Sequence, residues 1–289
     1  MAVVAQLVRA LDCGSKCRGF ESRRSPTFTP RFCMTTLQAL LIGLLQGLTE
    51  FLPISSSAHL KLAKVFLNIP SGEEQVVFDL VCHLGTLIAV LLFLRKDILA
   101  LYREKRDTLK LIIIALFPLV PMYFFLKPLR DFASDISFLG FSLIFTSMIL
   151  FLAGKIQLKK NPSKKISDAL FIGSMQSAAL IPGISRSAST IAAARFRGWE
   201  ASDAVRFSFL LSIPTILGGN ALELLKIAIS KQNLERISFS SCIIGFLSSF
   251  IIGMIVIRYA IRFLEKGNLK PFAWYCLTLG IITTLYFYG

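Results

Sequence analysis

One stretch of the sequence occurs twice, and each copy interrupts a long apolar run. Residues 42–58, IGLLQGLTEFLPISSSA, recur 130 positions later as residues 172–188, IGSMQSAALIPGISRSA, with seven of seventeen positions identical. Each copy has an apolar run, a break at Pro or Pro-Gly, a Ser-rich loop and a second apolar run. In a bilayer, non-helical backbone is tolerated only where it is buried in protein or lines a polar cavity. The two breaks therefore indicate a binding site.

The composition is that of an integral membrane protein. The chain has 289 residues, of which 54% are hydrophobic, and its mean hydropathy is +0.67. The net charge of +15 comes from basic residues that lie between apolar segments. This is the distribution that the positive-inside rule describes, so nucleic acid is not an expected partner. The six cysteines show no metal-ligand spacing and are interpreted as small core residues.

The first 33 residues differ from the rest of the chain. They contain six Lys and Arg and no long apolar run, so they resemble neither a signal peptide nor a span. Residues 5–10, AQLVRA, and 20–22, FES, back-translate into sequences that resemble the D arm and the T loop of a tRNA gene. We therefore expect residues 1–33 to be a non-native extension and translation to start at Met34.

The remaining residues, 34–289, are predicted to form one all-α polytopic membrane domain. Repeat 1 covers residues 34–154 and repeat 2 covers residues 168–289, and each is expected to consist of one re-entrant helical hairpin and three transmembrane helices. Three spans are an odd number, so the second hairpin would enter from the opposite face and the two repeats would be inverted. The predicted spans are 76–94, 109–126, 136–154, 205–228, 239–262 and 271–288, with kinks at Pro118, Pro121 and Pro214.

Counting basic residues along this topology gives its orientation. Eighteen Lys and Arg fall on the face that carries residues 95–110 and 155–165, whereas seven fall on the other face. The first face is therefore predicted to be cytoplasmic, which places the first hairpin and the C-terminus outside.

One basic residue, Arg186, belongs to neither face, because it lies at the tip of the second hairpin. A cation at membrane depth costs several kcal/mol unless it has an anionic partner or an aqueous site. Hydroxyl groups surround it, and the helix that starts after the break offers free N–H groups, so the loop suits a phosphate group. A purely structural pairing with a protein carboxylate is the alternative. The candidate phosphate-binding residues of this loop are Ser185, Arg186, Ser187 and Thr190.

The first hairpin supplies complementary chemistry. Gln46 and Glu50 are four residues apart and share a helix face. Three hydroxyls, those of Ser55, Ser56 and Ser57, follow the break, and His59 lies just beyond. Glu50 is a candidate base or metal ligand, Ser56 a candidate nucleophile and His59 a candidate proton carrier, while Gln46, Ser55 and Ser57 are candidate substrate-binding residues. A Ser beside a helix break is also a common cap.

Two further residues, Asp79 and His83, lie four apart in the first span. They either line the cavity or have a structural pairing, since charged groups in spans usually face inward for one of these reasons. The sequence does not decide between the two.

The motifs resemble those of a known family. Residues 46–59, QGLTEFLPISSSAH, and 182–190, PGISRSAST, are similar to the two signature motifs of the undecaprenyl-diphosphate phosphatases, also called bacitracin-resistance proteins, as is FSFLLSIP at 207–214. The resemblance covers the chain from about Met34 to its end. Gln46 stands where the family has Glu or Gln, and since Gln cannot act as a base, that role passes to Glu50 or His59.

The resemblance implies hydrolysis of undecaprenyl diphosphate to the monophosphate, which recycles the lipid carrier of cell-wall synthesis. It also implies a divalent cation, Mg²⁺ or Ca²⁺, at Glu50, and a site in the bacterial inner membrane that opens to the periplasmic face. The expected partners are the lipid substrate and the bilayer, and a homodimer is left open. A secondary transporter or lipid flippase for an anionic substrate is the alternative, because inverted repeats with broken hairpins are also transporter architecture.

Overall fold

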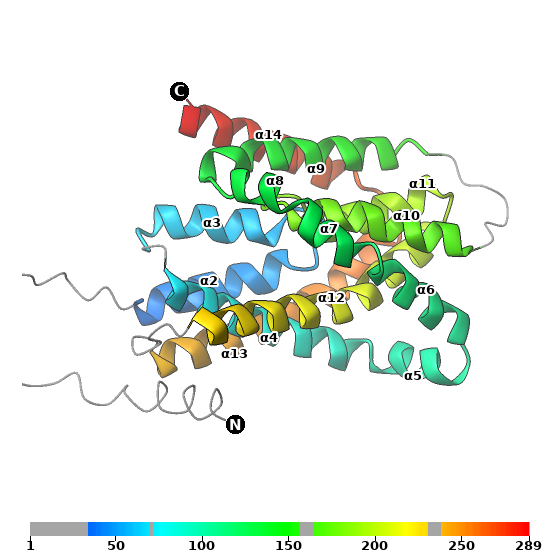
Figure 1. The fold of residues 1–289 in the computed structure, drawn as a ribbon, viewed down its shortest axis with the longest axis horizontal. Coiled ribbons are helices and arrows are strands. Elements are labelled where there is room, and N and C mark those ends of the chain that lie inside the picture. Colours follow the sequence, from blue (N-terminus) through cyan, green and yellow to red (C-terminus); the bar gives the residue numbers. More distant parts are fainter. Residues whose placement is uncertain (1–33, 70–71, 157–163, 231–237, 289) are drawn as a thin grey trace, which may run out of the picture.

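The computed structural model describes residues 34–69, 72–156, 164–230 and 238–288 (Figure 1). Within these ranges the regular secondary structure is entirely helical, and no strand occurs. The predicted all-α class is therefore confirmed. The predicted N-terminal extension, residues 1–33, lies outside the described residues.

Both copies of the repeated stretch fold as a helix, a break and a second helix. In the first copy the break contains Pro53, and in the second it contains Gly183, whose φ of +93° lies in the region that favours glycine. A serine caps the second helix of each pair: Ser55 and Ser185 accept hydrogen bonds from the backbone N–H of Ala58 and Ala188. The helices are α2 (Thr36–Thr49), α3 (Ser56–Phe66), α10 (Ile166–Ser177) with the 3-10 turn η3 (Ala178–Leu180), and α11 (Arg186–Phe196).

Five helical segments in the described part of the chain are long and apolar enough to cross a membrane. They are Gln75–Phe93, Arg106–Phe125, Ile136–Ala153, Ala201–Ile229 and Phe239–Leu264, and each coincides with a predicted span. The helices that form them are α4 (Glu73–Phe93), α6 (Arg106–Leu116), α7 (Leu119–Phe125), η2 (Ile136–Phe138), α9 (Leu139–Ala153), α12 (Ala201–Ser230) and α13 (Phe239–Leu264).

The sixth predicted span, 271–288, coincides with α14 (Lys270–Tyr288), which falls outside that set of five. Its Trp, Tyr and Thr side chains lower its mean hydropathy. Of the predicted kinks, that at Pro118 appears as the break between α6 and α7, where the proline lacks the N–H group for one hydrogen bond of the helix. α12 continues as one helix through Pro214. The short helices α5 (Arg95–Arg103) and α8 (Lys127–Phe132) connect longer ones.

The two repeats use equivalent glycines for close helix packing. Gly43 and Gly173 occupy the same repeat position. A Cβ at Gly43 would lie 2.7 Å from the carbonyl oxygen of Gly245 on α13, and one at Gly173 would lie 2.1 Å from that of Ala115 on α6. Only glycine permits such an approach of two helix backbones. This explains why this residue is identical in the two copies.

A clasp closes the base of each hairpin, again at equivalent positions. Gln38 Nε2 donates to the backbone oxygen of Leu67 over 3.0 Å, which ties the start of α2 to the end of α3. At the positions 130 residues later, Arg197 Nε lies 2.5 Å from Asp168 Oδ1 and ties α11 to α10. The side chain of Trp199 also donates to Asp168, over 3.1 Å. The second clasp is therefore ionic where the first is neutral.

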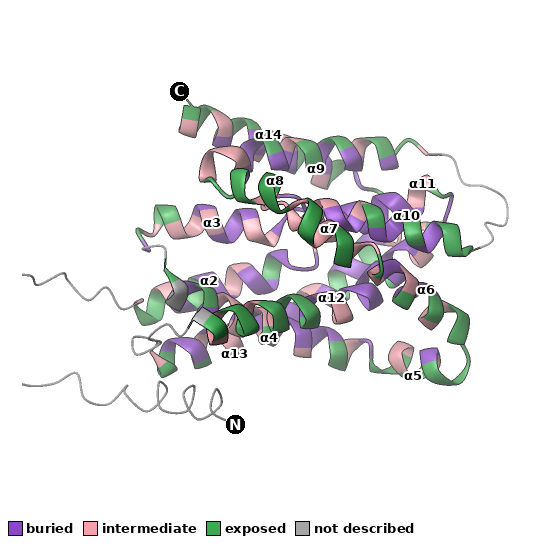
Figure 2. Ribbon diagram, in the orientation of Figure 1, coloured by how far each residue is buried: buried purple, intermediate pink, exposed green. Residues whose placement is uncertain are grey.

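The two hairpins approach the middle of the molecule from opposite ends, α2 and α3 from the left and α10 and α11 from the right in Figure 1. Their breaks meet there. Residues 187–194 of α11 are all buried, so this short helix lies in the core, whereas α7 and α8 are largely exposed (Figure 2). The inversion of the two repeats with respect to a membrane stays a prediction.

Candidate active site

An ion pair joins the tips of the two hairpins. Nη2 of Arg186, the first residue of α11, lies 2.7 Å from Oε1 of Glu50, the C-cap residue that follows α2. The side chain of Glu50 is 5% exposed and that of Arg186 is 15% exposed. Phe51, which follows Glu50, stacks on Phe209 of α12 and fixes the end of α2 in the core. The anionic partner that Arg186 requires is therefore Glu50.

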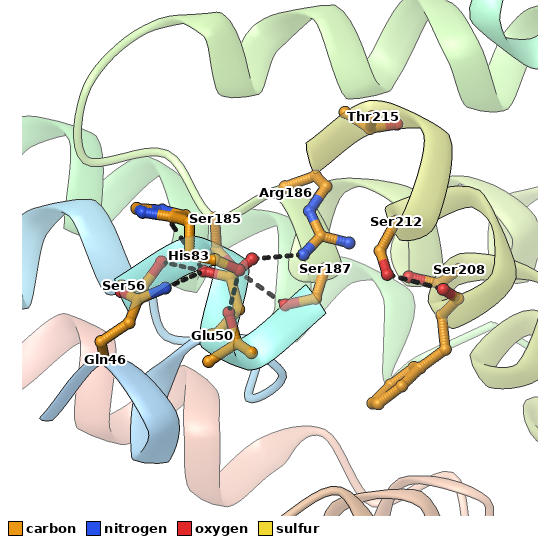
Figure 3. Close-up of polar contacts among 12 residues, drawn as sticks. Gln46, Glu50, Ser56, His83, Ser185, Arg186, Ser187, Ser208, Ser212 and Thr215 are labelled. Atoms are coloured by element: carbon orange, nitrogen blue, oxygen red, sulfur yellow. Dashed lines mark hydrogen bonds and ion pairs between the residues drawn. The ribbon is translucent and has the colours of Figure 1, made fainter. Parts of the chain in front are cut away.

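The second oxygen of Glu50 accepts two further hydrogen bonds (Figure 3). Gln46 Nε2 donates over 3.0 Å, and the hydroxyl of Ser56 donates over 2.8 Å. A serine hydroxyl that donates to a carboxylate is arranged as a nucleophile beside its base. The structure thus brings together Glu50, Ser56 and Arg186, the three residues for which the sequence predicted base, nucleophile and anion-binding roles.

A histidine of α4 also lies near the second oxygen of Glu50. Nε2 of His83 is 3.8 Å from Glu50 Oε2. Its Nδ1 lies 2.7 Å from the backbone oxygen of Asp79, and since a carbonyl only accepts, Nδ1 carries a proton. Nε2 therefore is the nitrogen that can take up or release a proton next to Glu50. Of the two interpretations of His83 that the sequence left open, the structure favours the cavity.

These groups line a cavity of about 240 Å³ between the hairpin tips. The rest of its wall comes from α7, α12 and the end of α10, including Leu119, Thr215 and Asn220. Seven of the predicted site residues line this cavity: Glu50, Ser55, Ser56, Ser57, Ser185, Arg186 and Ser187.

The hydroxyls of the two tips form matching contacts. The Oγ atoms of Ser55 and Ser57 are 3.2 Å apart, as are those of Ser185 and Ser187. Each tip also binds the other, because Ser187 donates to the backbone oxygen of Leu52 over 2.9 Å and Ser57 accepts from the backbone N–H of Gly183 over 3.3 Å. The hydroxyls thus hold the two breaks together at the edge of the cavity.

Three predicted residues do not line the cavity. His59 stacks on Tyr275 of α14 and its Nε2 lies 2.8 Å from the hydroxyl of that residue. The hydroxyl of Thr190 is bound inside the core, 2.6 Å from that of Ser208. Gln46 lies behind Glu50 and contacts its carboxylate without lining the cavity.

Sequence reasoning did not select Gln176, whose side chain lies at the cavity. It is 2% exposed, and neither atom of its amide group has a hydrogen-bond partner among the described residues. Gln176 is the repeat equivalent of Gln46, and this identity was the signal that could have identified it. Thr215 and Asn220 carried no such signal, because they lie outside the repeated stretch.

The donor groups suit a divalent cation only together with a phosphorylated ligand. Among the described residues no three His, Cys, Asp or Glu side chains form a cluster that would hold a metal by itself. Glu50 is the single carboxylate of the cavity, and Oε1 of the neighbouring Gln46 has no hydrogen-bond partner among the described residues. Mg²⁺ is commonly held by one or two carboxylates and by phosphate oxygens of the substrate. Glu50 is the residue that would hold such an ion.

Comparison with known proteins relates this chain to a single family. The protein named undecaprenyl-diphosphatase from Protochlamydia amoebophila is 40% identical over 255 residues, which are 88% of this chain and 99% of that protein. Proteins of the same name from Carboxydothermus hydrogenoformans and Halothermothrix orenii are each 38% identical, over 86% of this chain and over 96% and 97% of their own lengths. The model of the bacitracin resistance protein BacA family matches residues 39–282. The chain therefore belongs to the bacitracin resistance protein BacA family.

Proposed function

We propose that this chain is a membrane phosphatase that hydrolyses undecaprenyl diphosphate to undecaprenyl phosphate and inorganic phosphate. The observation that carries the proposal is the contact of Glu50 with both Arg186 and Ser56 at a cavity between two helix breaks. The names of the relatives and the five apolar helices agree with a lipid diphosphate as the substrate.

In the proposed mechanism, residues of the second hairpin bind the diphosphate of the substrate. The guanidinium of Arg186 and the N-terminal N–H groups of α11 are positive groups that bind diphosphate oxygens and stabilise the charge that develops on the transferred phosphoryl group. The amide of Gln176 lies on the same cavity, and neither of its polar atoms has a hydrogen-bond partner among the described residues, so it hydrogen bonds a phosphate oxygen. The prenyl chain extends along apolar residues such as Leu119 and Ile216, which line the cavity.

Residues of the first hairpin carry out the hydrolysis. Ser56 attacks the terminal phosphorus, and Glu50 takes the proton from its hydroxyl. The bond from phosphorus to the bridging oxygen breaks, and undecaprenyl phosphate leaves. Water then hydrolyses the phosphoserine and releases inorganic phosphate, with Glu50 and His83 moving the protons. Direct attack by water from the position of the Ser56 hydroxyl is the second route, and it uses the same base.

A divalent cation, Mg²⁺ or Ca²⁺, is proposed to bind with the diphosphate at Glu50. It would neutralise charge on the substrate in a poorly solvated cavity. The residues of the chain that take part are Glu50 and its neighbour Gln46, whose Oε1 has no partner among the described residues.

The protein is proposed to lie in the bacterial inner membrane with its site open to the periplasmic face. This rests on the excess of Lys and Arg on the face of residues 95–110 and 155–165. In this position it would recycle the carrier lipid of cell-wall synthesis and confer resistance to bacitracin. A homodimer stays a prediction.

Purified protein in detergent tests the proposed function. Release of inorganic phosphate from a prenyl diphosphate, dependent on Mg²⁺ or Ca²⁺, is the expected result. A transporter or flippase moves its substrate between two compartments and forms no product, so absence of phosphate release from folded protein would favour that alternative.

A further inference from the structure

A second cavity, of about 280 Å³, lies at one end of three spans. The span Gln75–Phe93 ends there, the span Ala201–Ile229 begins nearby, and the last two turns of the span Phe239–Leu264 form part of the wall. Helix ends of this kind mark the boundary between the hydrocarbon region and the headgroups. The cavity is therefore placed at the level of lipid headgroups.

The wall of this cavity combines an apolar side with a basic side. Phe93, Leu94 and Ile261 form the apolar part. The charged lining consists of three arginines, Arg206, Arg258 and Arg262, and two carboxylates, Asp97 and Glu265, so its formal charge is 3 − 2 = +1.

The carboxylates are already bound to one of the arginines. Arg206 Nε lies 3.0 Å from Glu265 Oε1, and Arg206 Nη1 lies 3.5 Å from Asp97 Oδ1. Arg258 and Arg262 have no ion-pair partner among the residues that the structure describes. They are four residues apart on α13 and so share one helix face, where their like charges repel each other. An anion bound between them would remove this repulsion and accept bidentate hydrogen bonds.

We propose that this cavity binds the phosphate group of an anionic phospholipid. A guanidinium pair matches a phosphate diester, and the apolar wall of Phe93, Leu94 and Ile261 matches the adjoining acyl chain. A free phosphate ion could also contact the guanidinium pair, but it has no acyl chain to pack against the apolar wall. The lipid is therefore favoured as the source of the phosphate group. The predicted orientation places this end in the cytoplasmic leaflet, whose surface is negatively charged.

Thermal unfolding of the full chain in nanodiscs tests the proposal. Nanodiscs of phosphatidylcholine alone are compared with nanodiscs that also contain phosphatidylglycerol. Phosphatidylglycerol is expected to raise the Tm of the parent protein by about 3 °C or more. This rise in Tm should be lost in the double variant Arg258→Gln/Arg262→Gln. It should be retained in Arg103→Gln/Lys105→Gln, a matched control that removes two exposed cations which do not line the cavity.

Two further measurements keep the test decisive. Arg258→Lys/Arg262→Lys retains the charge and is expected to keep only part of the rise, because an ammonium group lacks the guanidinium fork. Native mass spectrometry counts phosphatidylglycerol molecules bound to each variant, even where the Tm of the double variant is already low. Equal stabilisation of the parent and the Gln double variant would overturn the site, as would equal loss in the control. Equal stabilisation by inorganic phosphate in phosphatidylcholine nanodiscs would overturn the lipid as the ligand.

Discussion

Ser56 and Arg186 occupy the same position in the two copies of the repeat, 130 residues apart, and both contact the carboxylate of Glu50. The hydroxyl of Ser56 donates to Oε2 over 2.8 Å, and Nη2 of Arg186 lies 2.7 Å from Oε1. Glu50 itself has no acidic equivalent, since its repeat position in the second copy is Leu180. One scaffold is thus used twice, and differences at two positions between its copies, Glu50/Leu180 and Ser56/Arg186, bring together a carboxylate, a hydroxyl and a guanidinium.

The first prediction concerns the ion pair of Glu50 and Arg186. Arg186→Ala and Glu50→Gln should each lower phosphate release by about 10²–10⁴, because a buried charge-assisted contact of this kind contributes about 3–5 kcal/mol. Arg186→Lys should recover only part of the activity. Lys110→Gln, which removes an exposed ion pair with Asp107, is the matched control.

The same pair can be tested for a purely structural role. An apolar pair often replaces a buried ion pair without loss of stability. If Glu50 and Arg186 only hold the hairpins together, the double variant Glu50→Leu/Arg186→Leu should restore phosphate release. We expect a folded and inactive protein.

The second prediction concerns Ser56 as nucleophile. Ser56→Ala should lower kcat by at least about 10²-fold, since removal of a nucleophile leaves only attack by water. Acid quench of the parent during turnover of a prenyl diphosphate labelled in its terminal phosphate should trap label on the protein, and none on the variant. The control is Ser174→Ala, which removes an exposed hydroxyl of α10. A near-normal kcat for Ser56→Ala would exclude covalent catalysis at this residue and leave attack by water.

The third prediction separates the two histidines. His83→Gln should lower kcat by about 10²-fold, because Nε2 of His83 faces Glu50 at 3.8 Å. His59→Gln should have a smaller effect, similar to that of Tyr275→Phe, because its Nε2 lies 2.8 Å from the hydroxyl of Tyr275. The reverse order of effects would support the role predicted for His59 from the sequence.

The fourth prediction concerns Gln176. Gln176→Leu should raise KM by about 10-fold with a smaller change in kcat, because a hydrogen bond to a charged group contributes about 1.5–3 kcal/mol. Gln75→Leu is the matched control, since Gln75 is also buried and its amide oxygen has no hydrogen-bond partner among the described residues, but it does not line the cavity. An unchanged KM for Gln176→Leu would remove this residue from the diphosphate site.

The fifth prediction concerns the clasp at the base of the second hairpin. Burial raises the pKa of Asp168. The hydrogen bonds from Arg197 and Trp199 lower the pKa by more than burial raises it, so the pKa lies below its ordinary value of 3.8. The carboxylate therefore stabilises the fold fully above about pH 4, and the stabilisation is lost as the pH falls through the folded-state pKa.

Thermal unfolding as a function of pH measures this contribution. At neutral pH, Asp168→Asn should lower the Tm by a few degrees, whereas Asp107→Asn, at an exposed position, should not. Below about pH 4 the parent should lose more of its Tm than the Asp168→Asn variant does. A parallel decline of the two proteins would show that the clasp does not depend on the charge of Asp168.

The class of the protein and the position of the candidate site followed from local patterns. The length of an apolar run determines whether it can span a bilayer, and five of the six predicted spans have this length and apolarity in the structure. Pro53 and the Pro182-Gly183 pair disfavour a continuous helix, so the breaks were predictable too. A cation at membrane depth needs an anionic partner, for which the sequence favoured a phosphate group and left a protein carboxylate as the alternative; in the structure the partner of Arg186 is the carboxylate of Glu50, in the equivalent stretch of the other repeat.

The tertiary structure decided which side chains meet at the cavity. His59 lies three residues from Ser56, yet the packing of α3 against α14 turns it to Tyr275, 216 residues away. His83 and Gln176 reach Glu50 and the cavity instead, because α4 and the end of α10 lie next to the hairpin tips. The sequence determines which side chains share a face of one helix. Which other helix packs against that face depends on interactions between residues far apart in the chain, and a local sequence pattern does not predict them.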